Sequence, residues 1–334
     1  MDTWVDQLNR RAKILMDQVM ATRISAQQTG QDFGWLEQQY RDMIERLYAE
    51  EYASARLRDT SDLVIRAEGP GADHDAPSLR SFNWLSEHVQ KQLTRLSAAM
   101  LPMAVSDAKA AAKRLQWSFM GYAPGSIMMG FALHQPLSLS GLEESNREAF
   151  DLISNSAQAI AGVPQFVGEV DLDYSINEAI PDPALRDAAI IAAWYLSPTM
   201  QSGIHTIEIA SRSGEHGTLS QRERMVLNSV IKHPELRTQK LEGNFVGWLR
   251  SADLDKRRAV LRDVDGLDSA IRCILDPGLE SAAQNFFGGR VKATGRYECD
   301  NDGRPRLMYV DCIEPASTPC HNLTPTVARE FPLE

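Results

Sequence analysis

The sequence predicts a multidomain α+β protein with an N-terminal helical hairpin, a central α+β domain that contains a β-hairpin, and a C-terminal small β-barrel of five strands. Two observations carry this prediction. Apolar residues recur at three- and four-residue steps near the N-terminus, as in amphipathic helices. After residue 240 the pattern changes to short alternating segments between turn residues, as in an all-β unit. We therefore expect domains at 1–58, 59–236 and 237–316, followed by a tail at 317–334.

The apolar spacing of the N-terminal segment predicts two helices. Asp2 or Thr3 can cap the first helix, and the polar stretch SAQQTGQD separates it from the second. The expected inward positions are Val5, Leu8, Ala12, Leu15, Met16 and Val19 in the first helix, and Phe33, Leu36, Tyr40, Met43, Ile44 and Leu47 in the second. Two such helices leave apolar surface exposed. We expect the hairpin to pack on the next domain or on a second copy of itself.

The central domain is predicted to mix strands and helices. Ser78 caps the helix with the most regular apolar stripe, and Pro183 stands in the first turn of another helix, where its missing N–H costs little. Thr218 or Ser220 is expected to cap a later helix, and Ser220 and Glu223 have the spacing of a capping box. The expected elements are a strand at 62–67, a loop at 68–77, a helix from Ser78, a β-hairpin at 115–134, helices at 142–161 and 180–196, a strand at 203–211 and a helix at 218–231.

The C-terminal unit is predicted to contain three strands, a helix and two further strands. This order resembles the OB-fold, a five-stranded Greek-key barrel. An SH3-like barrel is the alternative, and the helix after the third strand favours the OB-like arrangement. Gly243, Gly247 and Gly295 inside strands suit the sharp bends of a small barrel. The strands are expected at 240–250, 257–263, 269–275, 289–298 and 306–314, and the helix at 276–287.

The barrel is a poor match to OB barrels that bind single-stranded nucleic acid. Such barrels stack bases on aromatic residues, each worth roughly 1–3 kcal/mol, and the second and third strands here contain none. The loops that would contact nucleic acid are acidic, with Asp253, Asp255, Asp300 and Asp302. Binding would require a continuous basic stripe through Arg257, Arg258, Arg262 and Arg272. The sequence favours a barrel that supports the fold or binds a protein.

The candidates for chemistry are few, because no GxGxxG, Walker, HExxH, GxSxG or zinc-ribbon motif is present. Asp73, His74 and Asp75 form a cluster in a Gly/Pro-rich loop that could hold a metal or supply an acid–base pair. A solvated loop is the simpler interpretation. Gly125 and Ser126 expose backbone N–H groups in the sequence YAPGS, but no lysine follows as it would in a phosphate loop. A hairpin turn is the simpler interpretation here too.

His205 is a further binding candidate, on the strand expected at 203–211. Glu208 is three residues away, so the two side chains point to opposite faces and do not form a pair. We expect His205 to be half-buried and hydrogen-bonded. The segment GEHG at 214–217 is expected to be a turn before the following helix.

The four cysteines, Cys273, Cys299, Cys312 and Cys320, lie in the last quarter of the chain, and none forms a CxxC pair. Cys312 alternates with Val310, as a core residue of a strand would. With His321 the cysteines could in principle bind zinc, but their spacing matches no established pattern. We expect reduced thiols, mostly in the core.

The composition limits the classes of function. The net charge of −10 does not favour nucleic acid or an anionic membrane over the whole surface. No run of about 20 apolar residues and no signal peptide is evident, so we expect a cytoplasmic protein without a membrane partner. No cofactor is expected, and no metal site.

Three hypotheses about function follow. The preferred one is a non-enzymatic binding or regulatory protein that acts through protein–protein interaction, with itself or with another protein, through the N-terminal helices. The alternative is an enzyme or small-ligand-binding protein with a site between the central domain and the barrel, since pockets favour domain interfaces. The segments of Asp73–Asp75, Gly125–Ser126 and His205 would supply that site. A nucleic-acid-associated factor that uses the barrel is the least favoured.

Overall fold

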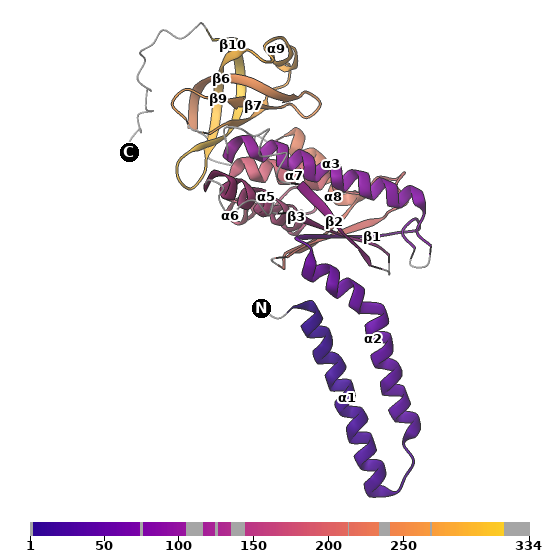
Figure 1. Ribbon diagram of the computed structural model, residues 1–334. Coiled ribbons are helices and arrows are strands. Elements are labelled where there is room, and N and C mark those ends of the chain that lie inside the picture. The colour runs from indigo at the N-terminus through magenta and orange to yellow at the C-terminus, as the bar shows by residue number, and fades with distance from the viewer. Residues whose placement is uncertain are drawn as a thin grey trace, which may run out of the picture.

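The computed structural model describes residues 3–73, 76–104, 116–123, 126–134, 144–212, 214–233, 241–267 and 269–316. It has the predicted α+β architecture. A helical hairpin projects from one end of a central domain, and a closed barrel lies at the other end (Figure 1). Between them, the central sheet lies nearer the hairpin, and a layer of helices lies nearer the barrel. Within the described part of the chain, no helix has both the length and the apolarity that crossing a membrane requires.

The hairpin consists of α1, Trp4–Thr29, and α2, Gly34–Thr60. Thr3, one of the two expected caps, caps α1 and also forms a capping box with Asp6, which was not anticipated from the sequence. The helix continues through most of the polar stretch that was expected to interrupt it. It ends where Gly30 adopts the left-handed conformation, with φ of 66°. At the base, the carboxylate of Asp59 accepts hydrogen bonds from the backbone N–H groups of Trp4 and Val5.

The contact between α1 and α2 is a narrow seam. Leu8, Ala12 and Val19 are buried in it, at the spacing of an antiparallel coiled coil. Met16 and Met43 were expected to face inward, but each is 46% exposed. The expectation was wrong because only one partner helix is present, and a single partner covers less of the helix surface than a globular core would.

The central sheet has five strands in the order β2-β3-β1-β4-β5, and all neighbours are antiparallel. Four of its strands match predicted segments. The fifth, β5, forms where GEHG was expected to be a turn, because its backbone pairs with β4. The strands are β1 Leu63–Glu68, β2 Gln116–Ala123, β3 Ile127–His134, β4 Thr206–Ser211 and β5 His216–Ser220.

The two faces of the sheet have different partners. Ile65, Met129 and Ile207 belong to the main core with the apolar residues of the helical layer. Val64 and Met128 face the other way and pack against Leu57 near the end of α2. The helices are α3 Leu79–Ala104, α5 Glu144–Gly162, α6 Ile176–Ala179, α7 Pro183–Leu196 and α8 Gln221–Lys232, with a 3₁₀ turn η2 at Val163–Phe166.

The barrel closes in the order β10-β8-β7-β6-β9. β8 and β10 are parallel, and every other neighbouring pair is antiparallel. Gly295 is required at a bend, since a Cβ there would lie 2.0 Å from the carbonyl oxygen of Tyr309. The elements are β6 Leu241–Asp253, β7 Arg258–Arg262, β8 Ile271–Leu275, α9 Glu280–Asn285, β9 Arg290–Cys299 and β10 Pro305–Pro315.

The cysteines lie in different environments. Cys273 is buried in the barrel core, as expected, and Cys299 is partly buried. Cys312 is exposed, contrary to the expected alternation with Val310. A bulge between Val310 and Cys312 shifts the register against β9 and reverses which side chains point outward. Cys320 lies outside the described residues.

Candidate functional sites at the domain interface and on the hairpin

The loop candidates do not form a recognisable catalytic site. Asp73 is exposed after β1, and its neighbours His74 and Asp75 lie outside the described residues. Gly125 also lies outside them, whereas Ser126 has a positive φ of 89° and its Oγ accepts a hydrogen bond from Arg66 Nε at 2.9 Å. Across the described residues, no group of three or more His, Cys, Asp and Glu side chains is arranged to hold a metal.

His205 is exposed, not half-buried as expected. It stands immediately before β4, which begins at Thr206. Its backbone N–H donates to the carbonyl oxygen of Glu68 at 2.7 Å. The pairing register brings His205, Ser126 and the loop of Asp73 to the same end of the sheet, but none of these side chains lines the cavity against the barrel described below.

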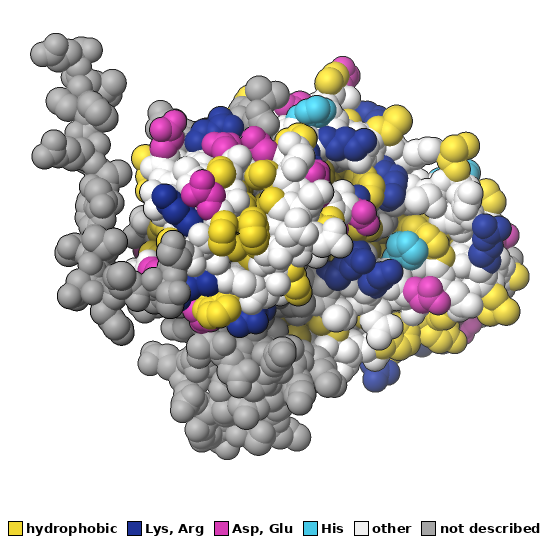
Figure 2. Space-filling model, turned by 90° about the horizontal axis from the view of Figure 1, so that it is seen from above, with side chains coloured by type: hydrophobic (Ala, Val, Ile, Leu, Met, Phe, Trp, Pro, Cys, Tyr) yellow, Lys and Arg dark blue, Asp and Glu magenta, His cyan; other side chains and the backbone are white. Residues whose placement is uncertain are grey.

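The barrel arginines have three different environments. Arg257 adopts a positive φ of 54°, and its Nη2 donates to the carbonyl oxygen of Lys232 at 2.8 Å. Arg262 is partly buried, and its Nε has no hydrogen-bond partner among the described residues. Arg258 is buried, with Arg272, at the contact with the central domain. Because Arg258 and Arg272 are buried and bonded to Asp187, the four arginines do not form one exposed basic stripe. Basic and acidic side chains are interspersed on the face drawn in Figure 2.

Asp187 on α7 is the centre of the contact between the central domain and the barrel. Its carboxylate accepts hydrogen bonds from Arg258 Nη2 at 2.6 Å and Nε at 3.0 Å. It also accepts one from Arg272 Nε at 2.7 Å. All three side chains are less than 10% exposed. One carboxylate thus neutralises two guanidinium groups only in part, and a positive charge remains at the contact.

Two further ion pairs join α7, or the residue that caps it, to the barrel. Arg186 Nη2 lies 2.7 Å from Glu298 Oε2, and Glu298 also accepts a hydrogen bond from the Tyr309 hydroxyl. Asp182 caps α7 through its Oδ1, and its Oδ2 accepts a hydrogen bond from Arg306 Nη2 at 2.9 Å. These paired groups fix how the barrel sits on α7, because buried charges are tolerated only in specific hydrogen-bonded geometries.

The interface shifts the pKa values of its groups. Burial tends to raise the pKa of the Asp187 carboxyl, but the charges and hydrogen bonds of Arg258 and Arg272 outweigh it and hold the pKa well below its ordinary value. Burial and the negative charge of Glu298 raise the pKa of the Tyr309 phenol. Asp187 is therefore ionised and Tyr309 neutral near pH 7.

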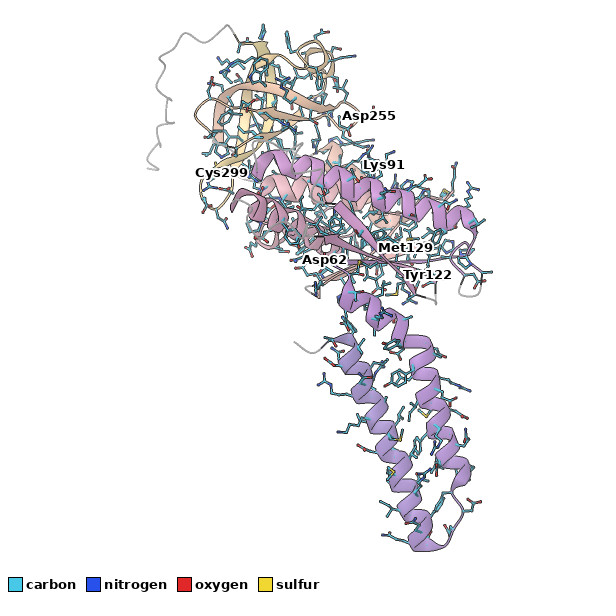
Figure 3. The ribbon with its side chains drawn as sticks, viewed as in Figure 1. Asp62, Lys91, Tyr122, Met129, Asp255 and Cys299 are labelled. Atoms are coloured by element: carbon cyan, nitrogen blue, oxygen red, sulfur yellow. The ribbon has the colours of Figure 1, made fainter. Side chains whose placement is uncertain are left out.

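A cavity of about 220 Å³ lies beside this interface, between α3, α7 and the barrel. Its apolar lining comes mainly from alanine and branched side chains of α7 and β7. Its polar lining residues include Gln92, Arg95, Tyr195, Ser251, Lys256 and Arg272. In Figure 3 the β6–β7 loop, marked by Asp255, lies next to α3, marked by Lys91.

Cations and aromatic rings meet beside the cavity, where Arg95, Tyr195 and Lys256 line it. Lys256 Nζ lies 3.8 Å from the centre of the Trp194 ring and 5.4 Å from that of Tyr195. The guanidinium of Arg95 lies 4.8 Å from the Tyr195 ring, and that of Arg224 lies 4.4 Å from the Trp194 ring. Burial lowers the pKa of Lys256, and the positive charge of Arg224 adds to this, against the effect of nearby aspartates.

The alternative hypothesis placed a site between the central domain and the barrel but assigned it to the segments of Asp73–Asp75, Gly125–Ser126 and His205, and none of their described side chains lines this cavity. A sequence feature of α7 could have indicated this interface. Arg186 and Asp187 are adjacent charged residues in an otherwise apolar helix, and an apolar helix can bury such residues only if partners come from elsewhere.

The hairpin carries a second unusual surface, which we call the hairpin face: Met16, Met20, Ile24, Tyr48 and Tyr52. Each of these side chains is at least 38% exposed. Met16, Met20 and Ile24 follow one another at steps of four on α1, and Tyr48 and Tyr52 do so on α2. The Tyr48 hydroxyl donates to Asn9, which shares the Met16 side of α1 by spacing, so the two stripes lie on the same side of the hairpin.

Comparison of the chain with known protein families, with curated proteins and with solved structures finds no match.

Proposed function

We propose that the protein is a non-enzymatic assembly protein whose hairpin pairs with the hairpin of a second copy. The observation that carries the proposal is the hairpin face, an apolar surface on an element that projects from the body (Figure 1). The hairpin meets the body at its base, where Leu57 packs against the sheet and Arg58 Nη2 lies 3.4 Å from Glu208 Oε1 of β4. Helices gain most of their stability from packing, and the narrow seam between α1 and α2 buries few side chains. The exposed apolar hairpin face therefore favours the binding of a partner that covers it.

The dimensions of the hairpin suit a dimer. A helix of 26 residues such as α1 is about 39 Å long, and two helices side by side are about 20 Å wide. One side of the hairpin thus presents about 800 Å², which is the contribution of each partner to a standard-size stable interface. Two copies related by a twofold axis would form a four-helix bundle.

The charge of the hairpin also favours a second copy over a nucleic acid or an anionic membrane. Residues 4–60 contain eight Lys and Arg and nine Asp and Glu, a net charge of −1. Most of the chain's charge of −10 therefore lies outside the hairpin. A nearly neutral element neither repels its own copy nor attracts phosphate groups.

We further infer that the barrel is OB-like and supports the fold. The strand order, the parallel pairing of β8 with β10 and the position of α9 between β8 and β9 support the OB-like arrangement. Nucleic-acid binding is disfavoured because Arg258 and Arg272 are already bound to Asp187.

Sedimentation velocity over a range of protein concentrations tests the dimer. The double variant Met20→Glu and Ile24→Glu places two charges on the hairpin face, and we expect it to be monomeric where the wild-type chain is dimeric. Burying unpaired charges in an apolar contact weakens the dimer by about a hundredfold or more. Both residues are about half exposed, so the folded body retains its melting temperature.

The control is the double variant Gln7→Glu and Gln18→Glu. It adds the same charge at exposed positions of α1 that lie on another side of the helix. We expect this control to remain dimeric. A wild-type chain that is monomeric at all concentrations, or a Met20→Glu and Ile24→Glu variant that is still a dimer, would contradict the proposal.

A further inference from the structure

The cavity between α3, α7 and the barrel has an excess of positive charge. Four basic residues line it, Arg95, Lys256, Arg258 and Arg272, and the only acidic residue in its described lining is Asp253, which is exposed. Asp187, next to the cavity, offsets one more charge through its bonds to Arg258 and Arg272. Two positive charges thus remain without a carboxylate.

Gln92 on α3 is the second observation. The residue is only 3% exposed and lines the cavity. Within the described part of the chain, no group forms a hydrogen bond with its side chain. The Gln92 amide atoms are not among the fully buried side-chain atoms that lack a partner, so they keep some exposure, and the cavity that the residue lines is the space they can face. An unpartnered amide at a cavity wall is available to complete its hydrogen bonds with a ligand there.

Two of the cations have free hydrogen-bonding capacity toward the same space. Arg272 uses only its Nε with Asp187, and its two Nη groups have no acceptor among the described residues. The Lys256 ammonium contacts the rings of Trp194 and Tyr195 but forms no ion pair with a described residue. Guanidinium and ammonium groups in this state are the donors that phosphate and carboxylate oxygens accept from.

We propose that the cavity binds a small molecule through an oxyanion, a phosphate or carboxylate group, held by Arg272, Lys256 and the amide of Gln92. The volume of about 220 Å³ is below the usual 300–1,000 Å³ range of drug-sized ligands, so the ligand is small. The apolar wall of α7 and β7 accommodates a short hydrocarbon part. The site does not depend on the hairpin face and is independent of the proposed dimer.

Calorimetric titration of the full chain with inorganic phosphate and with succinate, in chloride buffer of matched ionic strength, tests the site. We expect at least one of the two to bind, with a dissociation constant in roughly the millimolar range for so small a probe. Binding of phosphate alone assigns a phosphate ligand, and binding of succinate alone assigns a carboxylate. Binding of neither overturns the proposal.

Two variants show whether binding occurs in the cavity. Lys256→Gln removes the charge, and we expect about tenfold weaker binding, as for the loss of one charge-assisted hydrogen bond. Lys292→Gln is the matched control, because Lys292 belongs to the barrel but does not line the cavity. We expect this control to bind the anion as the wild-type chain does. If Lys256→Gln binds as the wild-type chain does, the probe is an adventitious ion only and the proposal fails.

Gln92→Leu separates binding from folding. Leucine has a similar size and removes an unpartnered amide, so the melting temperature without ligand is expected to stay the same or rise. Anion binding is expected to weaken about tenfold or more. Unchanged binding in Gln92→Leu, whether or not its melting temperature falls, would show that Gln92 does not contact the anion and would overturn its assigned role.

Discussion

The central domain is joined to its two neighbours by opposite kinds of contact. The barrel is held on α7 by buried charged groups centred on Asp187, with Arg258 and Arg272. The hairpin is held mainly by a few apolar side chains around Leu57, with one partly exposed ion pair between Arg58 and Glu208, and most of its length extends away from the body. The first contact specifies one geometry, because each charge needs its own partner. The second leaves apolar surface for another molecule.

The two contacts therefore concern different properties of the protein. The barrel contact affects the stability of the fold, and the exposed side of the hairpin affects the binding of a partner. Buried ion pairs often contribute little more than well-packed apolar residues, but removing one partner is costly. Exposed apolar residues contribute little to the isolated fold but a great deal once a partner covers them. The barrel and central domain should therefore respond to mutation as one unit, and the hairpin should respond separately.

The largest expected effect is at Asp187. Asp187→Asn removes the charge that faces Arg258 and Arg272 and leaves two guanidinium groups buried without a counter-ion. We expect a loss of about 3–5 kcal/mol in the free energy of unfolding, measured by urea denaturation at pH 7. Asp255→Asn on the exposed β6–β7 loop is the control, with a change within about 0.5 kcal/mol. Equal stability of the two variants would show that the network does not hold the domains together.

The next largest expected effect is a dependence of the unfolding free energy on pH in the acid range. The pKa of Asp187 is lowered in the folded chain, so its contribution to stability is complete above the unfolded-state pKa of about 3.9 and is lost as the pH falls below that value toward the folded-state pKa. We expect the difference in unfolding free energy between wild type and Asp187→Asn to shrink by about 1.4 kcal/mol per pH unit below pH 4. Urea denaturation from pH 7 to pH 3 measures it. A difference that stays constant over this range would show that the Asp187 carboxylate is not held by its arginines.

The same contrast explains how much of the molecule the sequence could predict. The apolar spacing predicted the helices. The capping residues narrowed the first cap to Asp2 or Thr3 and predicted the capping box of Ser220 and Glu223, because these features are set by residues within one or two turns. It placed Met16 and Met43 inside, because spacing indicates which side of a helix is apolar but not how much of that side a partner covers. The five strands of the barrel were predicted from their alternation, and the bulge that exposes Cys312 was not.

The residues of the domain interface could not be predicted from local pattern. Asp187 pairs with arginines that lie 71 and 85 positions away, and no spacing rule connects them. β5 was missed for a related reason, since it becomes a strand only because β4 offers an edge to pair with. Gln92 was not singled out because one amide in an amphipathic helix is ordinary until the cavity beside it is known.

The most direct test of the central claim is amide hydrogen–deuterium exchange of the full chain at several protein concentrations. If the hairpin pairs with a second copy, exchange in α1 and α2 slows as the concentration rises, while exchange in α7 and the barrel stays the same. Exchange in the hairpin that is independent of concentration would contradict the account. So would a slowing that spreads equally over the whole chain, because the hairpin would then not be the separate interaction element described here.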